Sequence, residues 1–307
     1  MSQLHAIFEA AKLETTKGKV ATYIPILAQA DPNHFSVCLI DEHGGQQTFG
    51  ESDVYFTLQS VVKVISFLVA ANFHSIEKMM HFVDVEPTGD SFNSIVRLES
   101  AQRKPFNPMI NAGAITVASL LPGSSPTEKV KSVTSFLEKL LDKPVRVDTK
   151  TYLSEYHSAD YNRAIAYILQ ANGYLNCEVE DALQTYLQLC SIAVTVEDLA
   201  KIALFLCTDD RQSEPLLNKK LLKVAKALML TCGMYNSSGK FAAFVGIPAK
   251  SGVSGAIIAI VKNSTIDSLS GAIGIGIYGP AIDEVGNSVA GIHFLSELDK
   301  HYDISIF

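Results

Sequence analysis

The chain has 307 residues, of which 48% are hydrophobic and 19% are charged, and its formal net charge is −7. This length fits one large domain or two closely packed lobes, and the composition is ordinary for a globular protein. The negative charge argues against binding to nucleic acid or to an anionic membrane. We expect no secretory signal, because the N-terminus lacks a basic segment followed by an apolar one. No apolar run reaches the roughly 18 residues that a membrane helix needs.

Cysteine and histidine patterns give no sign of a disulfide framework or a zinc site. The five cysteines are widely spaced and form no C-x-x-C pair, and the eight histidines form no H-E-x-x-H motif. Buried thiols in a reducing cytosol are the preferred interpretation. His81, Asp84 and Glu86 lie close together in the sequence, but a solvated loop explains them better than a metal site. We therefore expect a cytoplasmic protein without a metal site.

The N-terminal part of the chain begins with strand signals. Residues 35–41 and 44–50 predict a strand, a turn and a second strand. An apolar helix with one charge, Lys63, follows over 55–71. From about Ser75 to Thr231 the pattern is mostly helical. Helices are predicted over 91–100, 110–121, 126–142, 158–173, 179–192, 195–209 and 218–232.

Strand signals return near the C-terminus. Residues 240–252, 256–263 and 271–279 predict three adjacent strands, and 287–302 predicts a last helix. Strands at both ends with helices between them predict an α+β fold whose sheet is built from both ends of the chain. The G-x-G-x-x-G pattern at 274–279 lies inside an apolar strand and runs into proline, so we interpret its glycines as close-packing positions rather than a dinucleotide site.

Ser60 and Lys63 form an S-x-x-K motif near the start of the apolar helix. Residues three apart lie on one face of a helix, so a serine nucleophile and a lysine base would be neighbours. A lysine in apolar surroundings has a lowered pKa and can accept a proton. The motif is short and occurs by chance, with Ser60 as a helix cap and Lys63 reaching solvent. The apolar setting favours function, because burying an unpaired charge is costly.

A second motif, Lys250-Ser251-Gly252, lies on a predicted C-terminal strand. K-[ST]-G accompanies S-x-x-K in serine acyl-transferring enzymes. We expect Lys250 and Ser251 to face the site and Gly252 to let a substrate approach the backbone. The backbone N–H groups of Val253 and Ser60 would then form an oxyanion hole. A polar turn is the alternative, but two motifs in the right order favour function.

Long blocks of this sequence resemble the serine-dependent glutaminases. They are VEPTGDSFNS (85–94), KPFNPMINAGAI (104–115), TYLQLCSI (185–192) and CGMYNSSGKFAAFVGIPAKSGVSG (232–255). The resemblance extends over most of the chain and implies a β-lactamase/transpeptidase-like fold with an antiparallel sheet flanked by helices. We expect one catalytic domain over 1–307. Its α/β lobe would comprise approximately 1–74 and 233–307, and its helical lobe approximately 75–232.

The resemblance also implies roles for individual residues. Ser60 would be the nucleophile, Lys63 its partner, and Tyr235 a neighbour that relays the proton. The residues expected at the glutamine site are Tyr23, Gln59, Asn111, Glu155, Asn162, Tyr186 and Val253. Glu155 can neutralise the α-ammonium of a free amino acid, while asparagine and tyrosine donors can hold its carboxylate. No Ser-Asp-Asn triplet is present, so the general base stays open among Lys63, Tyr235 and a pair acting together.

The expected activity is hydrolysis of L-glutamine to L-glutamate and ammonia through a serine nucleophile, and it needs no metal and no organic cofactor. One alternative is another serine acyl-hydrolase of the same fold, such as a β-lactamase, esterase or peptidase. A second is a catalytically silent glutamine-binding protein, although intact Ser60, Lys63 and Lys250 argue against it. The family resemblance also suggests a homodimer or a homotetramer.

Overall fold

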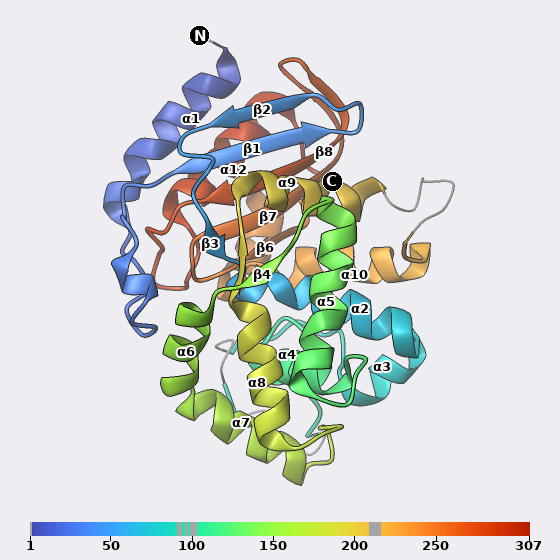
Figure 1. Ribbon diagram of the computed structural model, residues 1–307. Helices are drawn as coiled ribbons and strands as arrows, with labels where there is room; N and C mark the ends of the chain where they lie inside the picture. The colour runs from blue at the N-terminus through green and yellow to red at the C-terminus, as the bar shows by residue number, and fades with distance from the viewer. Residues whose placement is uncertain (1, 91–93, 96–97, 99–102, 209–215) are drawn as a thin grey trace.

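A five-stranded antiparallel sheet forms the centre of the computed structural model, which describes residues 2–90, 94–95, 98, 103–208 and 216–307. The strand order is β2-β1-β8-β7-β6. The strands are β1 (Ser36–Asp41), β2 (Gln46–Phe49), β6 (Ala249–Ser251), β7 (Ala256–Ile266) and β8 (Leu269–Tyr278). Because β1 pairs with β8 along its whole length, both ends of the chain build one sheet. The α+β prediction is confirmed (Figure 1).

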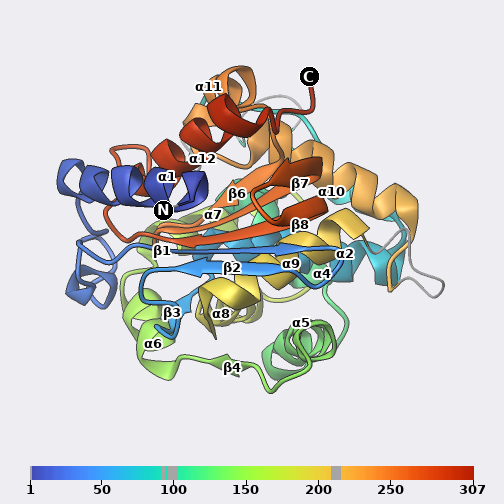
Figure 2. The same ribbon diagram turned by 90° about the horizontal axis from the view of Figure 1, so that it is seen from above.

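Helices cover both faces of this sheet. Helices α1 (Gln3–Leu13) and α12 (Val289–Tyr302) pack on one face, and α9 (Val196–Thr208) packs on the other (Figure 2). The close approach of α9 requires glycines in β8. A Cβ atom at Gly274 would lie 2.2 Å from the Ala200 carbonyl oxygen, and one at Gly276 would lie 2.1 Å from that of Val196. These glycines therefore serve packing, as the sequence predicted.

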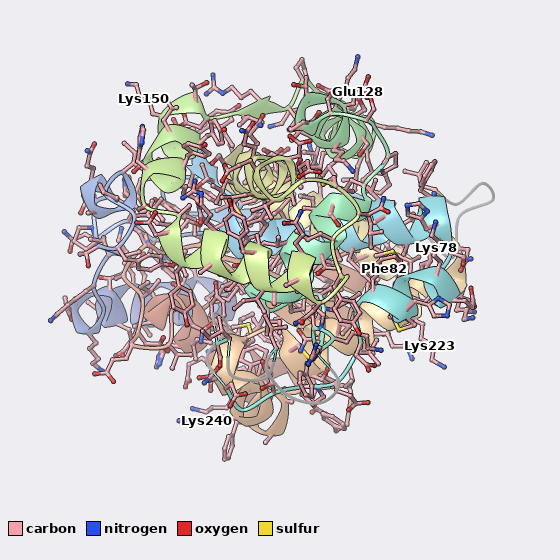
Figure 3. The ribbon with its side chains drawn as sticks, turned by 90° about the horizontal axis from the view of Figure 1, so that it is seen from below. Lys78, Phe82, Glu128, Lys150, Lys223 and Lys240 are labelled. Carbon is pink, nitrogen blue, oxygen red and sulfur yellow. The ribbon has the colours of Figure 1, made fainter. Side chains whose placement is uncertain are left out.

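Most of the remaining helices gather beyond α9, toward the part of the molecule that Figure 1 shows at the bottom. They are α2 (Val62–His74), α3 (Ile76–Phe82), α4 (Asn111–Leu120), α5 (Pro126–Leu141), α6 (Thr149–His157), α7 (Asp160–Ala171) and α8 (Val179–Cys190). Helix α10 (Lys219–Cys232) contacts α2 and the edge strand β6. Every residue of α4 is buried, and α2, α7 and α8 pack against it. The charged residues labelled in Figure 3, such as Glu128 and Lys150, are exposed at the periphery.

Two element predictions need correction, and one lies outside the described residues. Residues 240–244 belong to a short helix, α11 (Ser238–Phe244), and only Ala249–Ser251 form a strand. A second sheet, β3 (Phe56–Thr57), β5 (Ile192–Val194) and β4 (Arg146–Val147), was not predicted because its strands have only two or three residues. Most of the helix predicted over 91–100 lies outside the described residues.

Helix boundaries elsewhere follow the sequence signals closely. Thr195 and Asp198 form a capping box, since the Thr195 N–H donates to Asp198 Oδ2 and the Asp198 N–H donates to Thr195 Oγ1. Gly173 follows the C-cap residue of α7, Asn172, with a φ of 79°, a value typical of glycine after a helix. Among the described residues no single helix is long and apolar enough to cross a membrane, whereas the bent pair 59–74 and 76–82 meets that criterion by length and composition alone.

Candidate active site

Ser60 lies on a single 3-10 turn, Gln59–Val61, which leads directly into α2. The sequence predicted Ser60 on the α-helix itself, but the α-helix begins only at Val62. Ser60 is 7% exposed and Lys63 is 1% exposed. Gln59 adopts a φ of 48°, a conformation that is costly for a residue with a side chain. Such a conformation persists where the surrounding structure fixes the backbone, and Gly252 and Ser254 pack against this turn.

Lys63 is held by acceptors on and just before α4. Its ammonium donates to Oδ1 of Asn111 at 2.8 Å and to the carbonyl oxygen of Met109 at 3.1 Å. Burial disfavours the charged form and lowers the pKa of Lys63 to about 8, although Cys190 and Glu155 oppose the shift. The lysine is therefore partly neutral near physiological pH and can accept a proton.

Tyr235 approaches Ser60 from the other end of the chain. It begins the 3-10 turn Tyr235–Ser237 and has a φ of 51°. Its hydroxyl group interacts with the side chain of Ser60 and with the backbone of Val253. Burial raises the pKa of Tyr235 despite these two contacts, which favour the phenolate. The hydroxyl is thus protonated at neutral pH and lies against the predicted nucleophile.

Gly252 brings the end of β6 against the turn that carries Ser60. A Cβ atom at Gly252 would lie 2.7 Å from the carbonyl oxygen of Leu58 and 3.4 Å from the backbone nitrogen of Ser60. Ser254 fixes the same approach by donating a 2.7 Å hydrogen bond to the carbonyl oxygen of Thr57. The close approach at Gly252 is therefore to the chain itself, and it brings the segment containing Val253 next to Ser60.

Contrary to the sequence prediction, Lys250 and Ser251 do not face the site. Both are fully buried, and the ammonium of Lys250 donates to the carbonyl oxygens of Gly233 and Ser251. The same ammonium lies 4.6 Å from the centre of the Tyr235 ring. Lys250 therefore packs against the Tyr235 ring instead of facing the pocket.

A pocket of about 580 Å³ opens in front of Ser60. The predicted residues that line it are Tyr23, Gln59, Ser60, Asn111, Glu155, Asn162, Tyr186 and Val253. They come from the N-terminal loop, the Ser60 turn, α4, α6, α7, α8 and the segment after β6. Lys63 and Tyr235 are buried behind the pocket wall. The structure thus brings all ten predicted site residues together.

Glu155 closes one side of the pocket. The side-chain nitrogen of Gln59 donates to its Oε1 at 2.7 Å, which joins α6 to the turn that carries Ser60. Burial raises the pKa of Glu155 to about 7, while hydrogen bonds from Gln59 and Ser191 and the charge of Lys63 oppose the shift. A cation bound beside Glu155 would favour its charged form, because the opposite charge offsets the hydration that burial removes.

Polar side chains from three helices meet beside Lys63. Asn111 donates through Nδ2 to Oδ1 of Asn162 at 2.9 Å, and the Tyr186 hydroxyl donates to Oδ1 of Asn111 at 3.3 Å. Asn111 therefore connects Lys63 to the opposite wall of the pocket. Amide and phenol groups arranged in this way can hold a carboxylate without a full ion pair.

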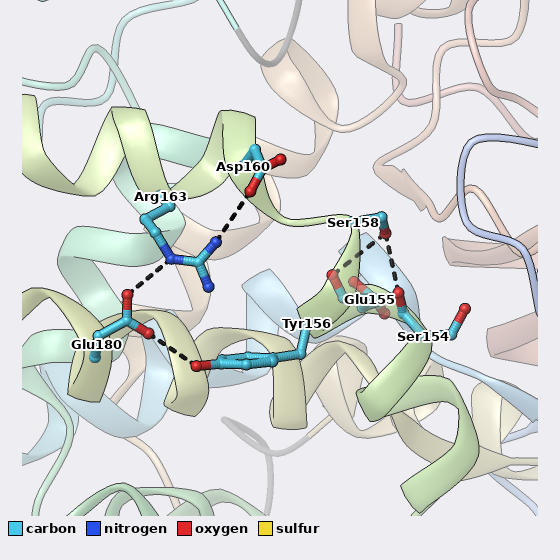
Figure 4. A network of polar contacts seen from close by, with 7 residues as sticks. All are labelled: Ser154, Glu155, Tyr156, Ser158, Asp160, Arg163 and Glu180. Carbon is cyan, nitrogen blue, oxygen red and sulfur yellow. Dashed lines mark hydrogen bonds and ion pairs between the residues drawn. The ribbon is translucent and has the colours of Figure 1, made fainter.

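A polar network on the outer side of α6, α7 and α8 ties together the helices that carry these groups (Figure 4). Arg163 donates to Oε1 of Glu180 at 2.8 Å and pairs with Asp160, and the Tyr156 hydroxyl donates to Oε2 of Glu180 at 3.2 Å. Tyr156 directly follows Glu155, and Arg163 directly follows Asn162. The network therefore fixes the backbone beside two pocket residues.

Sequence reasoning missed several residues that line the pocket. They are Cys190, Ser158, Tyr161, Lys17, Lys19 and residues 282–286. Cys190 could have been found, because it lies four residues after Tyr186 on the same face of α8. The others lie on loops or near the ends of helices and carry no spacing signal. Among the described residues, no group of three or more His, Cys, Asp or Glu side chains is placed to hold a metal ion.

The arrangement combines a buried serine, a lysine with a lowered pKa, a tyrosine hydroxyl and two backbone segments in close contact. These are the parts needed for acyl transfer through a covalent serine intermediate. The pocket beyond them offers one carboxylate and several neutral donors, which suits a small zwitterionic substrate. Geometry therefore points to an amidohydrolase or esterase of small amino-acid derivatives.

Comparison with known proteins identifies the family. The glutaminase family model matches residues 18–307. Glutaminase 2 of Bacillus anthracis is 49% identical over 95% of this chain and 91% of its own length, and glutaminase 1 of Bacillus subtilis is 46% identical over 99% and 95%. A Bacillus glutaminase crystallised in 4.3 M NaCl superimposes with a TM-score of 0.91 at 45% identity over 99% of each chain.

A Bacillus subtilis glutaminase in covalent complex with 5-oxo-L-norleucine superimposes with a TM-score of 0.89 at 43% identity, again over 99% of each chain. Agreement in sequence and in structure therefore extends over nearly the full length of both partners. The chain belongs to the glutaminase family and is a glutaminase.

Proposed function

We propose that Ser60 is the nucleophile that attacks the side-chain amide carbon of L-glutamine. The observation that carries this proposal is the contact between the Tyr235 hydroxyl and Ser60, one helical turn from Lys63, at the floor of the pocket. Attack forms a bond from Ser60 Oγ to the amide carbon, and the serine proton passes to the protein. The tetrahedral intermediate then expels ammonia and leaves a glutamyl ester on Ser60.

Lys63 is the proposed proton acceptor, with Tyr235 as the relay. With a pKa of about 8, roughly a tenth of Lys63 is neutral at pH 7. Burial raises the pKa of Tyr235, so its phenolate is far less populated. The tyrosine hydroxyl can receive the serine proton while it gives its own to the base. The same pair returns a proton to the departing nitrogen, which leaves as ammonia.

The negative oxygen of the intermediate would bind between the backbone N–H groups of Ser60 and Val253. Support comes from Gly252, which lies against Leu58 and the backbone of Ser60. Fixed N–H groups stabilise charge that develops only in the transition state. A water molecule then attacks the ester under base catalysis by the same pair, and glutamate is released.

Substrate selection is proposed to depend on Glu155 and on the amide cluster. Glu155 would bind the α-ammonium of glutamine, and Asn111, Asn162 and Tyr186 would hold its α-carboxylate. Tyr23 and Gln59 border the site. Support comes from the Bacillus subtilis relative, which forms a covalent complex by reaction with 6-diazo-5-oxo-L-norleucine. This reagent is a diazoketone that resembles glutamine. A site for this ligand must accept a free amino acid.

Ammonia release from glutamine tests the proposal. Ser60→Ala should reduce it to background while the fold survives, and the wild type should prefer glutamine over asparagine, an ester and a β-lactam. Full activity of Ser60→Ala would refute the serine mechanism. Turnover of the β-lactam or ester with none on glutamine would instead favour another acyl-hydrolase.

Broader features are proposed on the same basis. The fold would be of the β-lactamase/transpeptidase type, with one catalytic domain divided into an α/β lobe (about 1–74 and 233–307) and a helical lobe (about 75–232). The family resemblance supports a homodimer or homotetramer, which light scattering would test. The free state of all five cysteines supports a reducing compartment such as the cytoplasm, which cell fractionation would test.

A further inference from the structure

The tripeptide Gly233–Tyr235 reaches the active site in a strained conformation. Tyr235 has a φ of 51°, a conformation that is costly for a residue with a side chain. Such a conformation persists only where neighbouring groups fix it. The position of the Tyr235 hydroxyl against Ser60 therefore depends on whatever holds this tripeptide.

Two of these supports are close to Tyr235 in sequence or in the sheet. The Ser238 hydroxyl donates to the carbonyl oxygen of Tyr235 at 2.7 Å and accepts from the N–H of Met234 at 3.0 Å. On the other side, the N–H of Ser251 donates to the carbonyl oxygen of Gly233 at 3.1 Å, and Lys250 donates to the same oxygen. These contacts fix the first and last residues of the tripeptide.

The middle carbonyl is held by a residue from a different part of the chain. Asn287 donates through Nδ2 to the carbonyl oxygen of Met234 at 3.3 Å. Asn287 is fully buried, and its own backbone is fixed by Asp283, which accepts from the Asn287 N–H at 2.9 Å and donates its N–H to the Asn287 carbonyl at 2.8 Å. Within the described part of the chain, Oδ1 of Asn287 has no hydrogen-bond partner.

An asparagine is a costly choice for this position if it serves packing alone. A buried amide oxygen without a hydrogen-bond partner destabilises the folded protein, because its hydration is lost and not replaced. The compensating feature of the side chain is its donor, which reaches the residue immediately before Tyr235. The adjacent Gly286 also packs on the tyrosine ring, since a Cβ atom there would lie 3.4 Å from Cε2 of Tyr235. The loop 283–287 therefore supports both the backbone and the ring of Tyr235.

We propose that Asn287 is a positioning residue for the glutaminase reaction, which acts by fixing the Met234 carbonyl and thereby the Tyr235 hydroxyl against Ser60. This inference rests on the proposed role of Tyr235 in proton transfer. Asn287 does not line the pocket, so its loss should affect the chemical step more than substrate binding. A displacement of about 1 Å at a catalytic group can reduce the rate by about 100-fold.

Two substitutions separate positioning from general loss of structure. Asn287→Leu keeps the approximate volume but removes the donor, and kcat should fall about tenfold to 100-fold while KM for glutamine stays within about twofold. Asn287→Asp offers a donor only when its buried carboxyl group is protonated. The ratio of its kcat to that of the wild type should therefore rise as pH falls through the pKa of the new carboxyl group. Using this ratio cancels the pH dependence shared by both proteins.

The matched control is Thr116→Val. Thr116 is fully buried in α4, and among the described residues its hydroxyl also has no partner. Its replacement should change neither kcat nor the shape of the pH profile. A loss of kcat in Thr116→Val equal to that in the Asn287 variants would assign their effect to general core perturbation and overturn the proposal.

Tyr235→Phe distinguishes failure of this inference from failure of the proposed function. If Tyr235→Phe loses activity but Asn287→Leu is folded and retains kcat within about twofold, the positioning role is wrong and the tyrosine mechanism stands. If Tyr235→Phe keeps full activity, the tyrosine mechanism itself is wrong. Should Asn287→Leu fail to fold, the pH profile of Asn287→Asp decides, and a ratio that does not change with pH overturns the inference.

Discussion

The ammonium of Lys63 donates a 2.8 Å hydrogen bond to Oδ1 of Asn111, so the proposed base and the wall of the substrate pocket share one contact. An acceptor for the charged form raises the pKa of a lysine, in opposition to burial. Asn111 therefore limits how far the pKa of Lys63 can fall.

Asn111→Leu should move the activity profile to lower pH. Without its acceptor, the charged form of Lys63 is less favoured, so the pKa falls below about 8 and the neutral base persists at lower pH. The KM for glutamine should also rise, because a pocket contact is lost. The measurement is kcat as a function of pH. An acidic limb at the same pH as in the wild type would show that Lys63 is not the titrating base.

Glu155→Gln should stabilise the protein at neutral pH while it weakens substrate binding. The pKa of Glu155 is raised from 4.5 to about 7 in the folded protein. The folded protein therefore binds the Glu155 proton more tightly than the unfolded chain does. The stabilisation that this proton provides is present in full below a pH of about 4.5 and is lost as pH rises through about 7. A shift of this size corresponds to about 3 kcal/mol.

Urea unfolding at several pH values tests this expectation. The free energy of unfolding of the wild type should decline relative to that of Glu155→Gln as pH rises from about 4.5 to 7. Parallel curves for the two proteins would contradict the raised pKa. Such a gain in stability at the expense of activity is common at active sites.

The fold was predictable from sequence where apolar patterns are long, and unpredictable where elements are short. The sheet built from both chain ends followed from the order of the strand and helix signals, and the buried helix followed from the apolar run around Lys63. Residues 240–244 are apolar and short, and such runs fit a helix or a strand equally well. The direction of Lys250 could not be predicted, because it depends on the register of β6 and on the tripeptide that ends at Tyr235.

Gly252→Ala should damage catalysis more than any glycine substitution on the surface. The new Cβ would lie 2.7 Å from the carbonyl oxygen of Leu58, so β6 and the Ser60 turn must separate. We expect a loss in kcat of about 100-fold, the amount that one oxyanion donor contributes. The matched control is Gly239→Ala, where no atom lies within 4 Å. Wild-type kcat for Gly252→Ala would contradict an oxyanion hole at Val253.

Glu180→Ala should raise the KM for glutamine with little loss of stability. Glu180 holds Arg163 and Tyr156, whose neighbours in sequence are the pocket residues Asn162 and Glu155. The glutamate side chain is 41% exposed, so its ion pair contributes less than about 1 kcal/mol. The same change at Glu297, in an ion pair on α12, is the control and should leave KM unchanged. Equal KM values for the two variants would show that the network does not position the pocket.

Peptide mapping after reaction with 6-diazo-5-oxo-L-norleucine tests the serine mechanism most directly. Ser60 and Cys190 both line the pocket, so the reagent has two candidate nucleophiles within reach. Burial raises the pKa of Cys190 and keeps it a thiol, whereas Ser60 has Tyr235 and Lys63 beside it. We predict one adduct, on Ser60, and none in Ser60→Ala. An adduct on Cys190, or equal labelling of Ser60→Ala, would contradict Ser60 as the nucleophile.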